Sequence, residues 1–321
     1  MEYYPEEVRK YPHNSFLGVF PAFTGMELAC QEAMQDLVGH RLQKLVLAMD
    51  QGAMALYYFT TTDVDIISQL LLQKLLQNPD LIINQQKEFQ KLEPEFLGIC
   101  TKFENLSGFS NPEIASLFQE YTQHYAELRG KRNLYYHFLS KTLEPHLRQI
   151  LQDKNAGQHF TLLTTSPERT WAGEEKKHFL ELVQARLSCE FQNKLDEHVK
   201  FFQGLIFDYF GPKILDKNYF LEKLEEYSHS GKDVHEELSV EKKKRENLLQ
   251  EQVQVASKLN LTALEQKIFR SMQLLILMKE HKKRIHSRSH VPLQLKLMPE
   301  ISRRIGVEYK PEFMNSFLCL L

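Results

Sequence analysis

The chain has 321 residues, with 40 Lys and Arg against 42 Asp and Glu, which gives a formal net charge of −2. This near-neutrality excludes the basic field that holds nucleic acid or a membrane surface non-specifically, so we expect neither as a partner. Apolar residues make up 42% of the chain, enough for a folded core and too many for wholesale disorder. The 13 glycines are about half the average usage, which disfavours glycine-rich phosphate loops and β-sandwiches.

The N-terminal residues predict no export signal. The segment 1–7 is acidic and aromatic, and it lacks a basic region followed by an apolar one. The longest apolar stretch, Met272–Met278, is too short to cross a bilayer. The four cysteines are scattered and form no C-x-x-C pair. We therefore expect a reduced, cytoplasmic protein.

One β-hairpin is predicted near the N-terminus, at about residues 42–60. Two apolar, β-prone runs at 42–49 and 53–60 flank the turn signal Asp50-Gln51-Gly52. No other segment of the chain gives a persuasive strand pattern.

The remainder of the chain, from about 62 to 307, is predicted to be a helical body. A proline at 112 opens one helix, and a capping signal at Thr262 and Glu265 opens another. Because no linker rich in Gly, Ser or Pro divides the chain, we predict a mainly α fold, a single multi-helix compact domain over residues 1–321 with a short tail at 308–321. The expected helices span 26–38, 62–77, 80–101, 111–128, 135–151, 173–190, 195–202, 219–227, 240–259, 262–287 and 291–306.

The motifs of common enzymes are missing from the sequence. There is no G-x-G-x-x-G, P-loop, G-x-S-x-G or H-E-x-x-H pattern. His286 and His290 have helical spacing for a metal pair, but Pro292 predicts that the helix ends before His290, which favours a solvated helix end. Glu197 and His198 are adjacent and point about 100° apart on a helix, so they form no dyad. We therefore predict no catalytic or metal-binding residue, and the cofactor is unknown.

The densest basic cluster is the candidate anion-binding site. It consists of Lys279, Lys282, Lys283, Arg284 and Arg288. The favoured interpretation is a solvated helix C-terminus, where the helix dipole favours cations. The alternative is a contact to phosphate or another anion, because several cations fall within three helical turns. No aromatic residues that could stack on bases are interleaved, which argues against nucleic acid.

Two further patterns are interpreted as structural. The basic run 242–245 lies among glutamates and predicts a solvated helix face. Trp171, the only tryptophan, follows the apolar run 160–165 and is expected to be a buried packing anchor. A Tyr/Phe stripe at helical spacing predicts core packing and comprises Phe118, Tyr121, Tyr125, Tyr135, Tyr136 and Phe138.

Several segments together resemble the helical region of phosphoenolpyruvate-utilising, PEP-synthase-like proteins, with coverage of roughly residues 10–307. The resemblance rests on an L-x-x-H helix, an aromatic run, a Tyr-Phe-Gly-Pro break and a Tyr-Phe-Leu helix. The similar segments are 195–202, 209–212, 219–224, 160–167, 279–288, 297–306 and the hairpin at 42–60.

The departures from that family concern its chemistry. The family's swivelling domain carries a Thr-Ser-His motif whose histidine accepts the phosphoryl group, whereas Ser228-His229 and Ser289-His290 follow no threonine. Its nucleotide-grasp domain is not recognisable either. The resemblance therefore implies a region that is non-catalytic alone and acts with a protein partner supplying the catalytic domains. The competing hypothesis is a helical protein–protein interaction module with no role in phosphotransfer.

Overall fold

The computed structural model describes residues 8–14, 20–42, 45–50, 54–132, 135–206 and 214–309. The prediction of a mainly helical protein is confirmed. The described residues fall into two compact units, one made of 8–145 and 289–309 and the other of 146–206 and 214–288. Each unit combines stretches that are distant in sequence, so no single linker could mark a boundary. The single domain over 1–321 stays a prediction.

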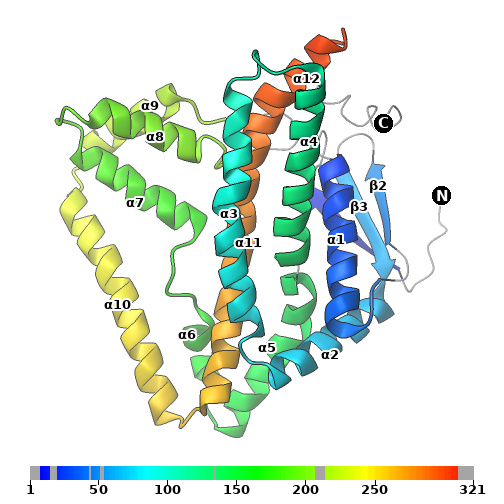
Figure 1. Cartoon of the computed structure of the whole chain (residues 1–321). Helices are drawn as coiled ribbons and strands as arrows, with labels where there is room; N and C mark the ends of the chain where they lie inside the picture. The colour runs from blue at the N-terminus through cyan, green and yellow to red at the C-terminus, as the bar shows by residue number, and fades with distance from the viewer. Residues whose placement is uncertain are drawn as a thin grey trace. The chain divides into compact units, whose positions relative to one another are not determined.

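The first unit contains a bundle of helices and a small sheet. Helices α3 and α4 run side by side, and α1 packs against α4 (Figure 1). Helices α5 and α11 each have residues in both units. The helical elements are α1 (Phe20–Val38), α2 (Thr61–Gln77), α3 (Leu81–Thr101), η1 (Lys102–Glu104), α4 (Asn111–Tyr125), η2 (Ala126–Lys131), α5 (Tyr135–Asp153), η4 (Leu293–Leu297) and α12 (Met298–Arg304).

The sheet corrects the expectation of one isolated hairpin. Strands β2 (Leu45–Asp50) and β3 (Met54–Thr60) pair antiparallel, and the turn residues 51–53 lie outside the described residues. A further strand, β1 (Val8–Asn14), pairs antiparallel with the other edge of β3, so the strand order is β1-β3-β2. Strand β1 was not predicted because its partner residues on β3 are 40 to 52 positions away in the chain, and no turn signal links the two strands.

Aromatic side chains fill the core of the first unit. Tyr121 and Tyr125 of α4 are fully buried, and the ring of Phe96 on α3 lies 5.4 Å from that of Tyr121. This confirms the expected core role of the α4 stripe, whereas the side chains of Tyr135 and Tyr136 lie outside the described residues. Because buried aromatic side chains remove large apolar areas from water, this stripe holds α3 and α4 together.

The helix ends show which local signals the fold uses. Helix α4 begins with a capping box formed by Ser110 and Glu113, with Pro112 in its first turn. The predicted box ahead of α11 is confirmed, because Thr262 N donates to Glu265 Oε2 at 2.6 Å and Glu265 N donates to Thr262 Oγ1 at 3.2 Å. Gly306 has a φ of +74°, as expected of the residue that ends a helix in the left-handed region.

The second unit consists of several short helices, the long helix α10 and most of the long helix α11. Helix α7 packs against α8 and α10, and α8 packs against α9 (Figure 1). Four helices, α7 to α10, begin earlier than predicted. Thr170, Asp216 and Asp233 are the N-caps of α7, α9 and α10. The elements are η3 (Gly157–His159), α6 (Phe160–Thr164), α7 (Trp171–Gln184), α8 (Phe191–Phe202), α9 (Lys217–His229), α10 (Val234–Lys258) and α11 (Ala263–Pro292).

Trp171 anchors the apolar core of the second unit, as predicted. Its side chain is 4% exposed, and its ring lies 4.6 Å from that of Phe202. The buried cluster around it is built from α7, α8, α9 and the residues just before α9, and it contains Leu182, Leu195, Phe202, Leu215, Phe220 and Leu224.

Candidate functional site

The five cations of the predicted anion site do not form one patch. At about 100° per residue, Lys279, Lys282 and Lys283 cover one side of α11, while Arg284 and Arg288 lie on the opposite side. The region is also not the predicted solvated helix C-terminus, because α11 continues to Pro292. Anion binding at these residues stays a prediction.

The two arginines contribute to packing within the second unit. Arg284 Nη1 lies 3.6 Å from Glu174 Oε1 of α7. The guanidinium carbon of Arg288 lies 4.0 Å from the centroid of the Phe201 ring on α8, which is the geometry of a cation–π contact. These arginines therefore stabilise the α11 contacts with α7 and α8.

The histidines between these cations are buried rather than solvated. His286 and His290 are 4% and 0% exposed, which corrects the expected solvated end. Burial, together with Arg284 for His281 and Arg129 for His290, lowers the pKa of His281 and His290 to about 3. Both rings are therefore neutral at pH 7. Within the described residues, no group of three or more His, Cys, Asp or Glu side chains could hold a metal ion.

Pro292 did not end the helix where the sequence predicted. Helix α11 includes His290 and Pro292, and the π-helical turn η4 follows it directly. A proline removes one backbone donor and clashes with the preceding turn, and here a π-helical turn, which is rare in proteins, begins directly after Pro292. The buried side chains of His290 and Val291 favour the continued helix through packing.

Glu197 and His198 behave as the spacing predicted. Glu197 is exposed and His198 is buried, so the two side chains do not form a dyad. The Nε2 atom of His198 instead lies 3.5 Å from Glu175 Oε1 on α7.

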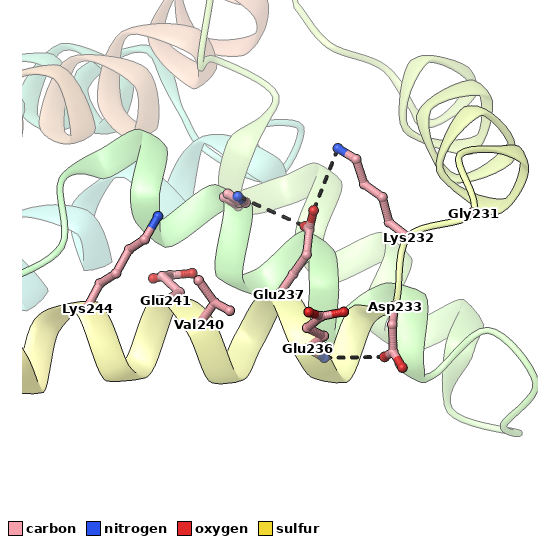
Figure 2. Close-up of a pocket in the computed structure, with 9 residues that line it drawn as sticks. Gly231, Lys232, Asp233, Glu236, Glu237, Val240, Glu241 and Lys244 are labelled. Carbon is pink, nitrogen blue, oxygen red and sulfur yellow. Dashed lines mark hydrogen bonds and ion pairs between the residues drawn. The ribbon is translucent and has the colours of Figure 1, made fainter.

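A charged groove at the start of α10 is the clearest candidate site. It has a volume of about 460 Å³ (Figure 2). Three lysines and four carboxylates line it, so its formal charge is 3 − 4 = −1. The lining residues are Lys176, Gly231, Lys232, Asp233, Glu236, Glu237, Val240, Glu241 and Lys244.

Three of the four carboxylates are engaged within the unit. Glu237 lies 3.6 Å from Lys232 Nζ, a contact marked by a dashed line in Figure 2, and 4.0 Å from Lys176 Nζ. Glu241 pairs with Arg169 at 2.7 Å. Asp233 accepts hydrogen bonds from the backbone N–H groups at the start of α10 and acts as its N-cap.

The remaining residues form a stripe along α10, which we call the α10 stripe: Glu236, Val240 and Lys244. Their spacing of four residues puts them on one face, and Figure 2 shows them following one another along the helix. Val240 is 41% exposed. Neither Glu236 nor Lys244, both exposed, forms an ion pair with another described residue. The stripe thus presents an acid, an apolar side chain and a base to solvent.

The sequence analysis interpreted this region only as a solvated helix face. The signal that could have identified the stripe is the i, i+4, i+8 spacing of an acid, a valine and a base. The sequence does not show this signal clearly, because the acids and bases of 236–246 are mixed and their order does not reveal which of them form ion pairs in the fold.

Comparisons with known proteins give no relative for this chain. No protein-family profile, curated protein or solved structure matches it. Among the described residues, no helix combines the length and the apolar character needed to cross a membrane. The expectation of a cytoplasmic location stays a prediction.

Proposed function

We propose that this chain is a helical interaction module that binds a partner protein through the α10 stripe. The observation that supports this most directly is the exposed sequence of acid, apolar side chain and base at Glu236, Val240 and Lys244. Neither charged end has an ion pair among the described residues, so both are available to a partner.

The surroundings of the stripe favour a protein ligand over a small one. Of the 25 residues of α10, all described, Gln252 alone is buried. The stripe spans nine residues, 236–244, or about 12 Å at 1.5 Å per residue step, which is the length of about two helical turns. A helix with a base, an apolar residue and an acid at the same spacing would match it in charge. Such complementarity contributes chiefly specificity and association rate.

The resemblance to PEP-utilising proteins stays a prediction. No comparison links the chain to that family. A partner that supplies catalytic domains is one form that the proposed interaction could take, and the experiment below does not presuppose it.

The test is site-specific photo-crosslinking in native cells from a crosslinking amino acid at Val240. The matched control places the same amino acid at Val253, which is 68% exposed and lies about 140° around α10 from Val240. We expect a discrete protein adduct from position 240 and none from 253. The proposal is wrong if both positions give the same adducts or if 240 gives none.

Charge exchange then tests the stripe itself. Glu236→Lys combined with Lys244→Glu inverts the stripe without changing net charge, and we expect the adduct to be lost. Lys242→Glu with Glu246→Lys is the control, since it inverts an exposed i, i+4 pair outside the groove, whose atoms are 3.9 Å apart. Loss of the adduct in both double variants would mean that the contact is not specific to the stripe.

A further inference from the structure

A second pocket lies in the same unit, between one face of α11 and the segment 161–170, which contains most of α6 and the chain that joins α6 to α7. Its volume is about 330 Å³, near the lower end of the range for small-molecule sites, so it suits a ligand of about one ring. Five hydroxyl side chains line it, with two carboxylates and two apolar residues. They are Thr161, Thr164, Thr165, Ser166, Thr170, Glu168, Glu280, Ile276 and Leu277.

Hydrogen bonds from side chains of α10 and α11 hold the segment that carries the hydroxyl groups in place. These side chains donate hydrogen bonds to four backbone carbonyl groups of the segment, which fixes its course before any ligand arrives. The bonds run from Gln252 Nε2 to the carbonyls of Leu162 and Thr165, both at 2.8 Å, from Gln273 Nε2 to that of Leu163 at 2.8 Å, and from Arg245 Nε to that of Pro167 at 2.9 Å.

The hydroxyl groups offer both donors and acceptors to the pocket. Thr170 Oγ1 accepts from Gly173 N at 3.1 Å, and Ser166 Oγ accepts from Glu168 N at 3.2 Å. Each of these two hydroxyls keeps its proton for donation. Thr164 and Thr165 instead donate to carbonyl groups four residues earlier, at 2.8 and 2.7 Å, and so keep lone pairs for acceptance.

The charges in the pocket are compensated. Glu168 pairs with Arg270, and Glu280 pairs with Lys283 at 2.7 Å. No net charge therefore selects an anion or a cation. A paired carboxylate still has lone pairs that accept hydrogen bonds from a hydroxyl group.

The α11 side of the pocket adds an apolar surface. Ile276 is 38% exposed and Leu277 is buried beside it. Aliphatic side chains can cover the C–H face of a ring while hydroxyl groups at its edge bond to the opposite wall.

We infer that this pocket binds a small, uncharged, polyhydroxylated ring, the chemistry shared by a monosaccharide, a cyclitol and the ribose of a nucleoside. Neighbouring hydroxyl groups on such a ring can donate to one wall group and accept from the next. This inference does not depend on the α10 stripe, and failure of either leaves the other intact.

The experiment uses the full chain with ¹³C-labelled threonine and isoleucine methyl groups. The probes are D-glucose, myo-inositol and uridine, each titrated to about 50 mM, which detects a millimolar Kd. We expect saturable shifts of the Thr161, Thr165 and Ile276 methyl signals with at least one probe, and the responding probe identifies the ring type. Absence of saturable shifts with all three probes would overturn the inference.

Two variants and a control locate the binding. Thr165→Val removes a lining hydroxyl with little change of shape, and Ile276→Phe fills the pocket. Thr122→Val on α4 is the matched control, because Thr122 also donates to the carbonyl four residues earlier, at 2.9 Å. We expect about a tenfold loss of affinity in Thr165→Val, the effect of about one hydrogen bond, and no change in the control. Ile276→Phe should lose at least as much affinity, because the larger side chain occupies the space of the ring. Unchanged affinity in either pocket variant means that the pocket is not the binding site.

Discussion

The hydroxyl group of Tyr121 lies 2.8 Å from Nδ1 of His290, and the two residues are separated by 169 positions in the chain. Both side chains are fully buried. This hydrogen bond connects α4 to the C-terminal end of α11 inside the first unit.

Removing that hydroxyl tests how much the contact stabilises the unit. We expect Tyr121→Phe to lower the free energy of unfolding by about 1–3 kcal/mol, because a buried polar atom of His290 loses a partner. The measurement is urea denaturation. Tyr219→Phe is the control at a 37% exposed ring, and its effect should stay within about 0.5 kcal/mol. Equal effects of the two variants would contradict the prediction.

The buried histidines predict that stability falls below neutral pH. The pKa of His281 and His290 is about 3 in the fold against an ordinary value of 6.5. Between these values the unfolded chain binds more protons, so the free energy of unfolding rises with pH and is lost as pH falls from about 6.5 towards 3. The slope approaches about 1.4 kcal/mol per pH unit for each histidine.

The window from pH 5 to 6.5 isolates this effect from the carboxylates. Glu300, whose pKa is lowered to about 2 by hydrogen bonds from Arg303 and Arg304, contributes in the same direction only around and below its ordinary value of 4.5. Denaturation curves recorded across this window give the free energy of unfolding at each pH. The increase of that free energy with pH should be smaller for the double variant His281→Gln, His290→Gln than for the natural chain. An unchanged slope would show that these histidines titrate alike in both states.

Gly130 allows α1 to approach the π-helical turn η2 closely. A Cβ atom at this position would lie 2.4 Å from the carbonyl oxygen of Met26 and 2.9 Å from Ala29 Cβ. We expect Gly130→Ala to destabilise the fold by about 1–3 kcal/mol, because backbone atoms must shift. Thermal unfolding followed by circular dichroism measures the effect.

Gly98 provides the matched control for that substitution. It lies in helix α3 of the same unit, and nothing is within 4 Å of the position of its Cβ. Because alanine favours a helix over glycine, Gly98→Ala should stabilise by about 0.5–1 kcal/mol. If both variants are destabilised to a similar extent, the effect of Gly130→Ala is not due to the close approach of α1 to η2.

Trp171 reports on the second unit because it is the only tryptophan. Its 4% exposure predicts a blue-shifted fluorescence emission that moves to the red on unfolding. Trp171→Ala should cost about 3–5 kcal/mol through the lost packing. Leu187→Ala, at a fully exposed side chain, is the control and should have no measurable effect. A cost well under about 1 kcal/mol for the tryptophan variant would contradict its role as an anchor.

We expect no phosphotransferase activity from the isolated chain. Phosphoryl transfer needs a phosphate cradle, a divalent cation and an acceptor held in line, and the sequence has no phosphate-loop motif and no Thr-Ser-His motif. The check is incubation with labelled ATP or phosphoenolpyruvate and Mg²⁺ or Mn²⁺, followed by a search for acid-labile label. Stoichiometric phosphohistidine on the chain would reverse this expectation and revive the resemblance to PEP-utilising proteins.

The sequence by itself determined the features that depend on neighbours along the chain. Helical periodicity, the capping box at Thr262 and Glu265, the left-handed Gly306 and the burial of Trp171 all follow from local conformational preference and apolar character. Such signals act over one or two turns, which is why the composition and spacing were sufficient to predict them.

The tertiary structure alone decided which polar residues share a surface. Within one charged run, Glu237 and Glu241 are paired by cations from other segments, whereas Glu236 and Lys244 line the groove without an ion pair to a described residue and define the α10 stripe. Likewise, the hydroxyl side chains of the segment 161–170 form a pocket wall because Gln252 of α10 and Gln273 of α11 donate hydrogen bonds to backbone carbonyl groups of that segment. These pairings join residues about 60 to 110 positions apart, and their choice depends on the packing of whole helices rather than on any local preference.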